Sequence, residues 1–417
     1  MTAPSPERGH GARVVGLVAG AHFFSHFYTL ALPPLFPILK AELGLSYIEL
    51  GGIITAFSIA SGSAQYPMGM AVDRFGARHI LIGGLALLAL SVASMGLASS
   101  YWHFLVLAFL AGLGNGVFHP ADYSILSASV REHRLGRAYS IHTFVGHVGW
   151  SLAPPVMIFL TALWNWRLAL AVVGCIGLAA AVVLFQQGRF LRSDHRPRTA
   201  GKTAGEVASE VPPPPQQSAL AMLTAMPVLM MFLFYTATAA ITVGLASFTP
   251  SALGALFGTP LVSANAALTA LLVGSAVGVL SGGYVADRLR RFDLISAIGF
   301  IAASLVMCLV AFVALPLAAL IVVFGFAGFM LGMVSPSRDL MVRAVTPPGA
   351  SGKVFGFVSV GLDVGGAGAP LLFGWILDQG APAGVYLAAA AMMLLSLLAA
   401  LAAARSRDRA PAPSPAE

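Results

Sequence analysis

The chain has 417 residues, of which 58% are hydrophobic and only 9% are charged. A soluble globular protein carries about 25% charged residues, so this composition excludes a water-soluble fold and indicates an integral membrane protein. Its apolar stretches run to about 20 residues without strict alternation, which favours α-helical spans over a β-barrel. The net charge of +7 would suit a nucleic-acid partner in a soluble protein, but the distribution of the charges gives another explanation, and no nucleic acid is expected.

Twelve apolar segments are predicted to span the membrane. In chain order they are 14–39, 49–72, 79–98, 104–129, 137–162, 167–188, 221–249, 262–286, 293–313, 316–340, 353–377 and 382–404. The first has no small-residue cleavage site, so it is expected to be a retained helix and not a signal peptide. Both cysteines, Cys175 and Cys308, fall inside spans, so no disulfide is predicted.

The basic residues predict the orientation of these spans. Twelve spans place both termini on one side. With that side in the cytoplasm, all of the 23 Lys and Arg residues except Lys40, Arg167 and Arg338 lie in cytoplasmic loops or tails. This asymmetry obeys the positive-inside rule. It predicts a multi-pass protein of a bacterial-type cytoplasmic (inner) membrane with cytoplasmic N- and C-termini.

A polar stretch between the sixth and seventh spans divides the chain. It contains four consecutive prolines and has too little apolar surface to fold alone. We therefore predict an N-terminal six-helix half over 1–188, a cytoplasmic linker over 189–220, a C-terminal six-helix half over 221–404 and a cytoplasmic tail over 405–417.

The two halves repeat each other. Pro336 lies 216 residues after Pro120, and the same offset relates Gly149 to Gly365 and Pro154 to Pro370. In the second span of each half, residues 69–79 match residues 283–293 at an offset of 214. Internal repeats of this kind are typical of secondary transporters, whose binding site lies where the repeats meet.

These features resemble the major facilitator superfamily, whose members have twelve helices in two pseudo-symmetric halves. The loop Gly69-x-x-x-Asp73-Arg74-x-Gly76-x-Arg78 resembles its cytoplasmic signature, and Gly283-x-x-x-Asp287-Arg288 is a weaker copy. The resemblance implies a cytoplasmic gate in which Asp73 pairs with helix ends of the opposite half. The alternative is a pair of solvated loop charges.

Within the superfamily, residues 21–46, 118–123 and 136–155 resemble the fosmidomycin-resistance-type branch. That resemblance implies proton-driven export of drugs or small organic anions. One departure weakens the antiport assignment. Drug–proton antiporters often carry G-x-x-x-G-P in the fifth helix, where this chain has Ala153 in place of the second glycine.

Several histidines lie inside predicted spans and are candidates to line a transport cavity. His22 and His26 are four residues apart and therefore share a helix face; with His142 and Trp150 they form the expected cavity lining. Histidine has an unperturbed pKa near 6.5, which suits a proton-coupled cycle. Metal ligation or a purely structural hydrogen bond are the alternatives for the His22/His26 pair. No metal site and no cofactor are expected.

The segment "FHPADY" holds the leading candidate for a proton-carrying group, Asp122, about 10 Å deep at 1.5 Å per helical residue. His119 lies one helical turn before it, within reach as a relay partner. Pro120 lacks an amide N–H and loosens the helix at that point. His147 and Asp363, paired by the repeat, are further proton-site candidates. The alternative for Asp122 is a structural salt bridge with an arginine.

The tenth span carries Arg338 and Asp339 near its cytoplasmic end. Arg338 is matched to Asp122 by the repeat and could be a planar clamp for an anion. It could equally form a gate ion pair with Asp339. The two alternatives stay open from sequence.

The sequence therefore predicts a non-enzymatic, proton-coupled exporter of small amphipathic or anionic compounds that works by alternating access, as a monomer in the lipid bilayer. A proton symporter that imports an organic anion is the alternative. A membrane-embedded metalloenzyme with histidine ligands would need more clustered histidines than one i, i+4 pair. A transport-inactive sensor would usually carry an added soluble domain.

Overall fold

The computed structural model describes residues 6–191, 223–289, 291–346 and 351–408. All regular structure in these ranges is helical. The first part contains α1 (Pro6–Thr29), η1 (Pro33–Leu35), α2 (Phe36–Leu43), α3 (Tyr47–Phe75), α4 (Ala77–Met95), α5 (Tyr101–Asn115), α6 (Phe118–Ser129), α7 (Glu132–Leu163), α8 (Trp166–Gln186) and η2 (Gly188–Phe190). The second part contains α10 (Met226–Phe257), α11 (Leu261–Leu289), α12 (Phe292–Phe312), α13 (Leu317–Val345), α14 (Ser351–Asp378) and α15 (Ala383–Asp408).

The predicted fold class, twelve transmembrane helices in two pseudo-symmetric halves, is confirmed. Eleven helical segments of the described chain are long and apolar enough to cross a membrane. The one remaining predicted span, 49–72, corresponds to α3, which has 29 residues but is less apolar. A helix that packs between the halves can carry polar residues on the faces that protein covers.

Prolines determine where two of the predicted spans are interrupted. Within the predicted span 14–39, α1 ends at Thr29, shortly before the two prolines that begin η1. The predicted span 104–129 is divided into α5 and α6 just before Pro120. Pro120 has no N–H to donate to the carbonyl four residues earlier, so the helix is interrupted at Gly116 and Val117, where the sequence predicted only a loosened helix.

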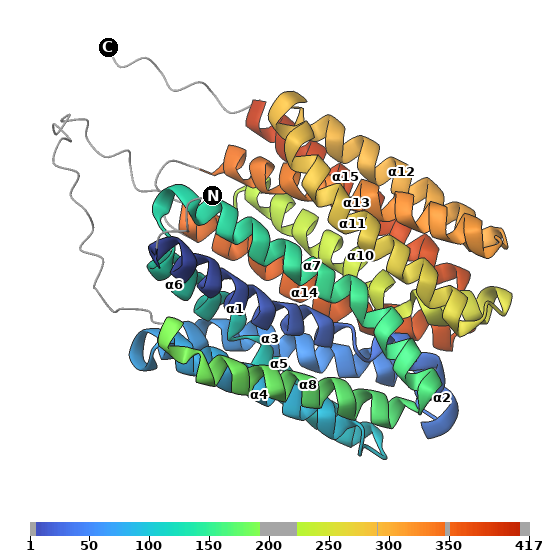
Figure 1. Ribbon diagram of the computed structural model, residues 1–417. Helices are drawn as coiled ribbons and strands as arrows, with labels where there is room; N and C mark the ends of the chain where they lie inside the picture. The colour runs from blue at the N-terminus through green and yellow to red at the C-terminus, as the bar shows by residue number, and fades with distance from the viewer. Residues whose placement is uncertain (1–5, 192–222, 290, 347–350, 409–417) are drawn as a thin grey trace, which may run out of the picture.

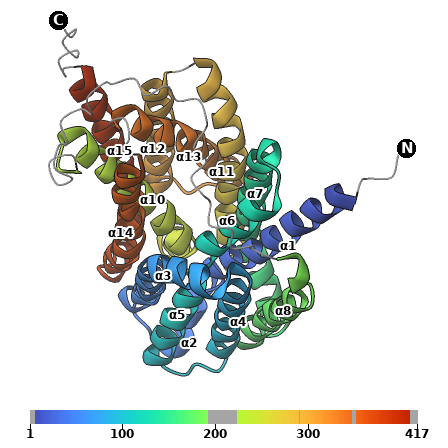
Figure 2. The same cartoon turned by 90° about the vertical axis from the view of Figure 1, so that its left-hand side faces the viewer.

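The helices run side by side and form two groups, α1–α8 and α10–α15 (Figures 1 and 2). The start of α1 and the end of α15 lie at the same end of the bundle, here called the terminal end (Figure 1). The opposite end, which carries α2, is called the far end. The predicted linker 189–220 lies mainly outside the described residues, so the predicted domain boundaries stay predictions.

The two groups meet along two helix pairs, α3 with α14 and α7 with α11. In Figure 2 these pairs lie on opposite sides of the junction. The repeat relates them. A Cβ atom at Gly62 of α3 would lie 2.9 Å from the carboxyl carbon of Asp363. The residues matched to them by the two offsets, Ala276 and His147, line one cavity between α7 and α11.

Polar and aromatic contacts join the halves at the far end. The Asp378 carboxylate accepts hydrogen bonds from the backbone N–H groups of Tyr47 (2.9 Å) and Ile48 (2.8 Å) at the start of α3. Lys40 Nζ lies 3.7 Å from Asp378 Oδ1. The rings of Phe36 and Phe248 are 5.4 Å apart. The halves are thus tied together at this end.

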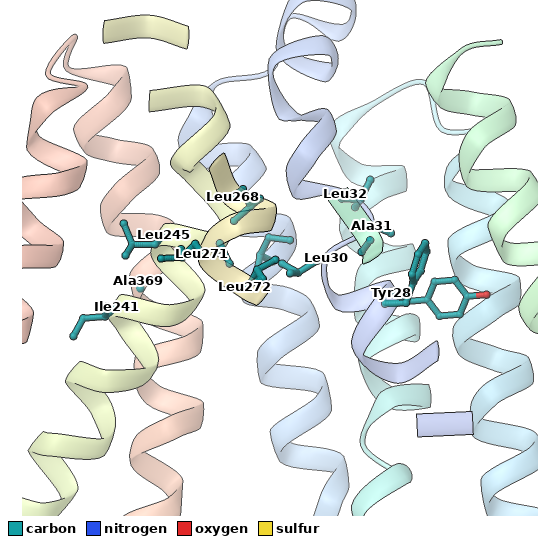
Figure 3. Close-up of a cluster of buried hydrophobic side chains, with 14 of the residues drawn as sticks. Tyr28, Leu30, Ala31, Leu32, Ile241, Leu245, Leu268, Leu271, Leu272 and Ala369 are labelled. Atoms are coloured by element: carbon teal, nitrogen blue, oxygen red, sulfur yellow. The ribbon is translucent and has the colours of Figure 1, made fainter. Parts of the chain in front are cut away.

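One continuous apolar cluster runs through both halves. Figure 3 shows part of it, with residues from the end of α1, from the segment after it and from α10, α11 and α14. The labelled members are Tyr28, Leu30, Ala31, Leu32, Ile241, Leu245, Leu268, Leu271, Leu272 and Ala369. Because this core is apolar, the few buried charged groups elsewhere stand out.

Candidate functional site

Three helices of the first half bring five histidines and one aspartate together. α1 contributes His22 and His26, α6 contributes His119 and Asp122, and α7 contributes His142 and His147. We call these six residues the histidine cluster. Small residues on α7 allow the close approach of α1. A Cβ atom at Gly146 would lie 2.8 Å from His22 Cδ2, and one at Gly149 would lie 2.4 Å from the Phe23 carbonyl oxygen.

Asp122 is the centre of the histidine cluster. Its Oδ2 lies 2.8 Å from His142 Nε2 in a hydrogen bond and 3.2 Å from His22 Nδ1. The rings of His22 and His142 stack with centroids 3.7 Å apart. Asp122 is 0% exposed, His142 1% and His22 3%. A carboxyl group held in this way can share or exchange a proton with either imidazole.

The partner of Asp122 differs from the one expected. His119 is exposed, and its ring stacks on Tyr123 at 5.9 Å. The hydrogen bond to Asp122 comes from His142 on another helix. The i, i+3 spacing within α6 placed His119 near Asp122 in sequence, but the packing of α7 against α6 decided which imidazole reaches the carboxylate.

The cluster continues from His22 towards the junction of the halves. The rings of His22 and His26 are 4.6 Å apart, and that of His26 lies 4.9 Å from the ring of Trp150. His147 follows at 6.0 Å from Trp150. His147 also lines a cavity of about 360 Å³ between α7 and α11. The cluster therefore extends from a buried carboxylate to a cavity wall.

Asp363 lies apart from these histidines. It is half-buried on α14 and faces α3, where its carboxyl group abuts Gly62. His147 and Asp363 thus occupy equivalent places in the two junctions and do not belong to one site. The repeat predicted this equivalence but not the separation.

Arg338 and Asp339 form a second polar group, in α13. Arg338 Nε donates to Asp339 Oδ1 at 2.9 Å, and the hydroxyl of Tyr235 donates to the same oxygen at 2.7 Å. The guanidinium carbon of Arg338 lies 4.5 Å from the centre of the Tyr235 ring. This geometry supplies the ion pair expected for a gate. It also leaves a planar cation beside an aromatic ring, which is compatible with an anion clamp.

The residues of the expected gate motifs lie at the terminal end, in the last turns of α3 and α11, at Gly76 and at the start of α4. Gly76 has φ of 85°, a conformation that favours glycine, so its place in the motif has a backbone reason. Arg78 Nη2 donates to the carbonyl of Phe185 at the end of α8, in its own half. The other motif residues are placed as follows: Gly69 lies beside Pro120, Arg74 stacks on Phe75, Arg288 stacks on Tyr284, and Asp73 and Asp287 are exposed.

A cavity of about 540 Å³ opens between α1, α6 and α7 at the terminal end. Three arginines at the beginning of α7 line it, Arg131 at the N-cap and Arg134 and Arg137 in the helix, and the rest of its wall is mainly apolar. Ile141 in this wall directly precedes His142. An amphipathic anion would find both charge and apolar surface here.

Sequence reasoning missed a polar network beside the cluster. Asn115 accepts a hydrogen bond from Ser25 at 2.7 Å and donates to Ser61 at 3.0 Å, which joins α5, α1 and α3. Asn115 is an amide at the end of an apolar run, and that signal could have identified it. Tyr235 was also missed, because a tyrosine in a predicted span carries no distinguishing pattern.

The family model of the Major Facilitator Superfamily matches residues 18–264 and 228–417. The chain belongs to this superfamily. The predicted superfamily membership and the similarity to the fosmidomycin-resistance-type branch are both confirmed.

Two relatives cover almost the whole chain. The fosmidomycin resistance protein of Escherichia coli (strain K12) is 26% identical over 92% of this chain and 91% of its own length. The hexuronate transporter of Bacillus subtilis (strain 168) is 22% identical over 91% of this chain and 92% of its own. A bacterial homologue of the human lysosomal transporter Spinster, solved in an inward-facing and unoccupied conformation, has the same fold. It superposes with a TM-score of 0.75 at 16% identity, covering 97% of this chain and 98% of its own.

Proposed function

We propose that this protein is a proton-coupled secondary transporter that exports small amphipathic or anionic compounds by alternating access. The observation that carries the proposal is the fully buried Asp122 between His22 and His142. A carboxylate inside a membrane span is costly and usually functional. Here it contacts two imidazole groups, which are side chains that can accept or donate a proton.

In the proposed cycle, Asp122 alternates between two partners, a proton and an imidazole. Its hydrogen bond with His142 holds the carboxyl group while the site is shut off from water. A change in the packing of α6 against α1 and α7 would separate Asp122 from His22 and His142 and expose it to solvent. Proton release then accompanies the change of state, because a ligand shifts a conformational equilibrium only through its unequal affinity for the two states.

We infer that the terminal end is cytoplasmic and that the membrane is a bacterial-type inner membrane, since the basic residues gather at that end. The far-end contacts of Asp378, Lys40 and Phe248 would then close the periplasmic side. The conformation would be inward-facing, the state also named for the Spinster homologue. The transporter is proposed to act as a monomer, without enzymatic activity.

Two observations favour an anionic or amphipathic substrate. The arginine-lined cavity offers three guanidinium groups beside apolar walls, and both near full-length relatives carry names that refer to fosmidomycin or hexuronate. The first name favours export with a resistance role, whereas the second keeps proton symport of an organic anion as the alternative. The direction of proton flux relative to substrate flux distinguishes the two.

The test is Asp122→Asn in proteoliposomes, with fosmidomycin and a hexuronate as probes. Asn is nearly isosteric and cannot release a proton, so uptake driven by a pH gradient should be lost while exchange of probe for probe continues. Asp293→Asn, a matched change in an exposed ion pair with Arg291, should alter neither. Normal proton-driven transport by Asp122→Asn contradicts the proposal. Loss of exchange together with early melting would instead identify Asp122 as a structural ion-pair partner, because breaking a buried pair costs about 3–5 kcal/mol.

A further inference from the structure

Three side chains of the histidine cluster present metal-ligating atoms to one another. His22, Asp122 and His142 each offer one atom, and these atoms all lie within 4.8 Å of one another. They come from three different helices and are all buried. The sequence expectation of no metal considered only the His22/His26 pair, because the tertiary contact with Asp122 and His142 is invisible in spacing.

Several polar atoms at this point lack hydrogen-bond partners. Asp122 Oδ1 and His22 Nδ1 are buried and make no hydrogen bond, and the same holds for His26 Nδ1 beside them. Leaving such atoms buried and unsatisfied is unfavourable, and more so when they are charged. In the described part of the chain, the ion pairs of Asp122 involve histidines and neither lysine nor arginine. A divalent cation would supply both the missing contacts and the missing charge.

The distances suit a first-row transition metal. Zinc binds imidazole nitrogen and carboxylate oxygen at about 2.0–2.2 Å, so two ligands of one tetrahedral ion lie about 3.4 Å apart. The two imidazole nitrogens here are 2.8 and 3.2 Å from the same carboxylate oxygen, and small shifts would accommodate the ion. Imidazole ligands favour zinc, copper or nickel, whereas magnesium prefers oxygen ligands.

We propose that His22 Nδ1, the Asp122 carboxylate and His142 Nε2 form a binding site for a divalent transition-metal ion of the Zn²⁺ class. A fourth position faces His26, whose ring lies 4.6 Å from that of His22, or takes a water molecule. The ion would tie α1, α6 and α7 together. This metal site goes beyond the proposed transport cycle, in which the same carboxylate binds a proton. Because one carboxylate serves both purposes, bound Zn²⁺ should inhibit proton-coupled transport.

The experiment measures Zn²⁺ binding to the purified full-length protein in detergent after removal of metal with a chelator. Titration calorimetry and metal analysis should give one tight Zn²⁺ per chain and no tight Mg²⁺. His142→Asn and His22→Asn should each weaken Zn²⁺ binding by at least about 10-fold, the effect that even outer-shell changes produce. His103→Asn, an exposed histidine at the start of α5, is the matched control and should bind as the wild type does.

A second readout does not depend on affinity alone. Co²⁺ in place of Zn²⁺ should give visible absorption bands in the wild type and in His103→Asn, and these bands should be absent in the two cluster variants. Elution profile and melting temperature without metal verify that each variant is folded, and Asp122→Asn provides a third variant. Absence of tight Zn²⁺ binding by the wild type, or equal binding by folded cluster variants, overturns the proposal. Because no transport is measured, either outcome is independent of the proton-coupling test.

Discussion

The two junctions between the halves are related by the repeat, yet they are built differently. At α3/α14 the backbones touch: Cβ atoms at Gly51 and Gly374 would lie 2.2 and 2.4 Å from carbonyl oxygens of the opposite helix. At α7/α11 two cavities of about 360 and 440 Å³ remain between the helices. One junction is tight and the other is loose.

The difference lies in residue size at equivalent positions. The offsets of 214 and 216 match Gly51 with Asn265 and Gly374 with Ile158. Asn265 and Ile158 both line the larger of the two cavities. Glycine lets backbones approach, whereas a larger side chain holds them apart. The repeat thus provides two similar junctions. Glycines at α3/α14 make that junction tight, whereas larger residues at the equivalent positions leave space at α7/α11.

The largest expected effect comes from opening the tight junction. Gly51→Leu places a side chain where the carbonyl oxygen of Pro370 now lies, so α3 and α14 must separate. Overpacking of this kind costs about 3 kcal/mol, at the upper end of the usual range, and the melting temperature should fall accordingly. Gly83→Leu, at a glycine with no neighbour within 4 Å, is the control. Equal melting temperatures for the two variants would show that the contact does not hold the halves together.

The next effect concerns the far-end anchor. Asp378→Ala removes the acceptor of two backbone N–H groups at the start of α3 and the partner of Lys40. Hydrogen bonds to a charged group contribute about 1.5–3 kcal/mol, and we expect a loss near 2 kcal/mol in denaturant unfolding. Asp378→Asn keeps an acceptor oxygen and should recover part of it. A full loss in the Asn variant would assign the effect to charge alone.

A smaller effect is expected midway along the same junction. The hydroxyl of Thr55 donates to the carbonyl of Ala367 at 2.7 Å, a neutral hydrogen bond between the halves. Thr55→Val keeps the shape and removes the bond, for an expected cost of about 1 kcal/mol. Thr242→Val, where the hydroxyl bonds only within its own helix, should cost less. Equal melting temperatures for the two variants would show that the hydrogen bond between the halves adds no more stability than one within a helix.

At the loose junction, a larger side chain should change transport much more than it changes stability. Ala276→Phe extends into the cavity that His147 lines, so the free energy of unfolding should change by less than about 0.5 kcal/mol. Transport of the probe should nevertheless fall by at least about tenfold, equal to about 1.4 kcal/mol in barrier height, because the cavity is blocked. Initial rates in proteoliposomes measure this. Normal transport would mean that the α7/α11 cavity plays no part in the cycle.

The sequence by itself determined the membrane class, the twelve spans and the internal repeat. These follow from composition, segment length and offset, which are one-dimensional properties of the chain. It also identified Asp122 as an unusual buried charge, and it predicted a loosened helix at Pro120, because a missing N–H is a local property.

Only the tertiary structure decided which groups meet. Asp122 bonds His142, twenty residues away on another helix, and not His119 on its own. Asp339 takes Tyr235 as a partner across 104 positions of sequence, and His147 and Asp363 occupy separate junctions. Such contacts depend on how each helix is rotated about its axis and on how closely it packs against its neighbour. Glycines such as Gly146 and Gly51 permit the close packing because they have no side chain. A spacing rule describes one helix and holds no information on the face that a second helix presents to it.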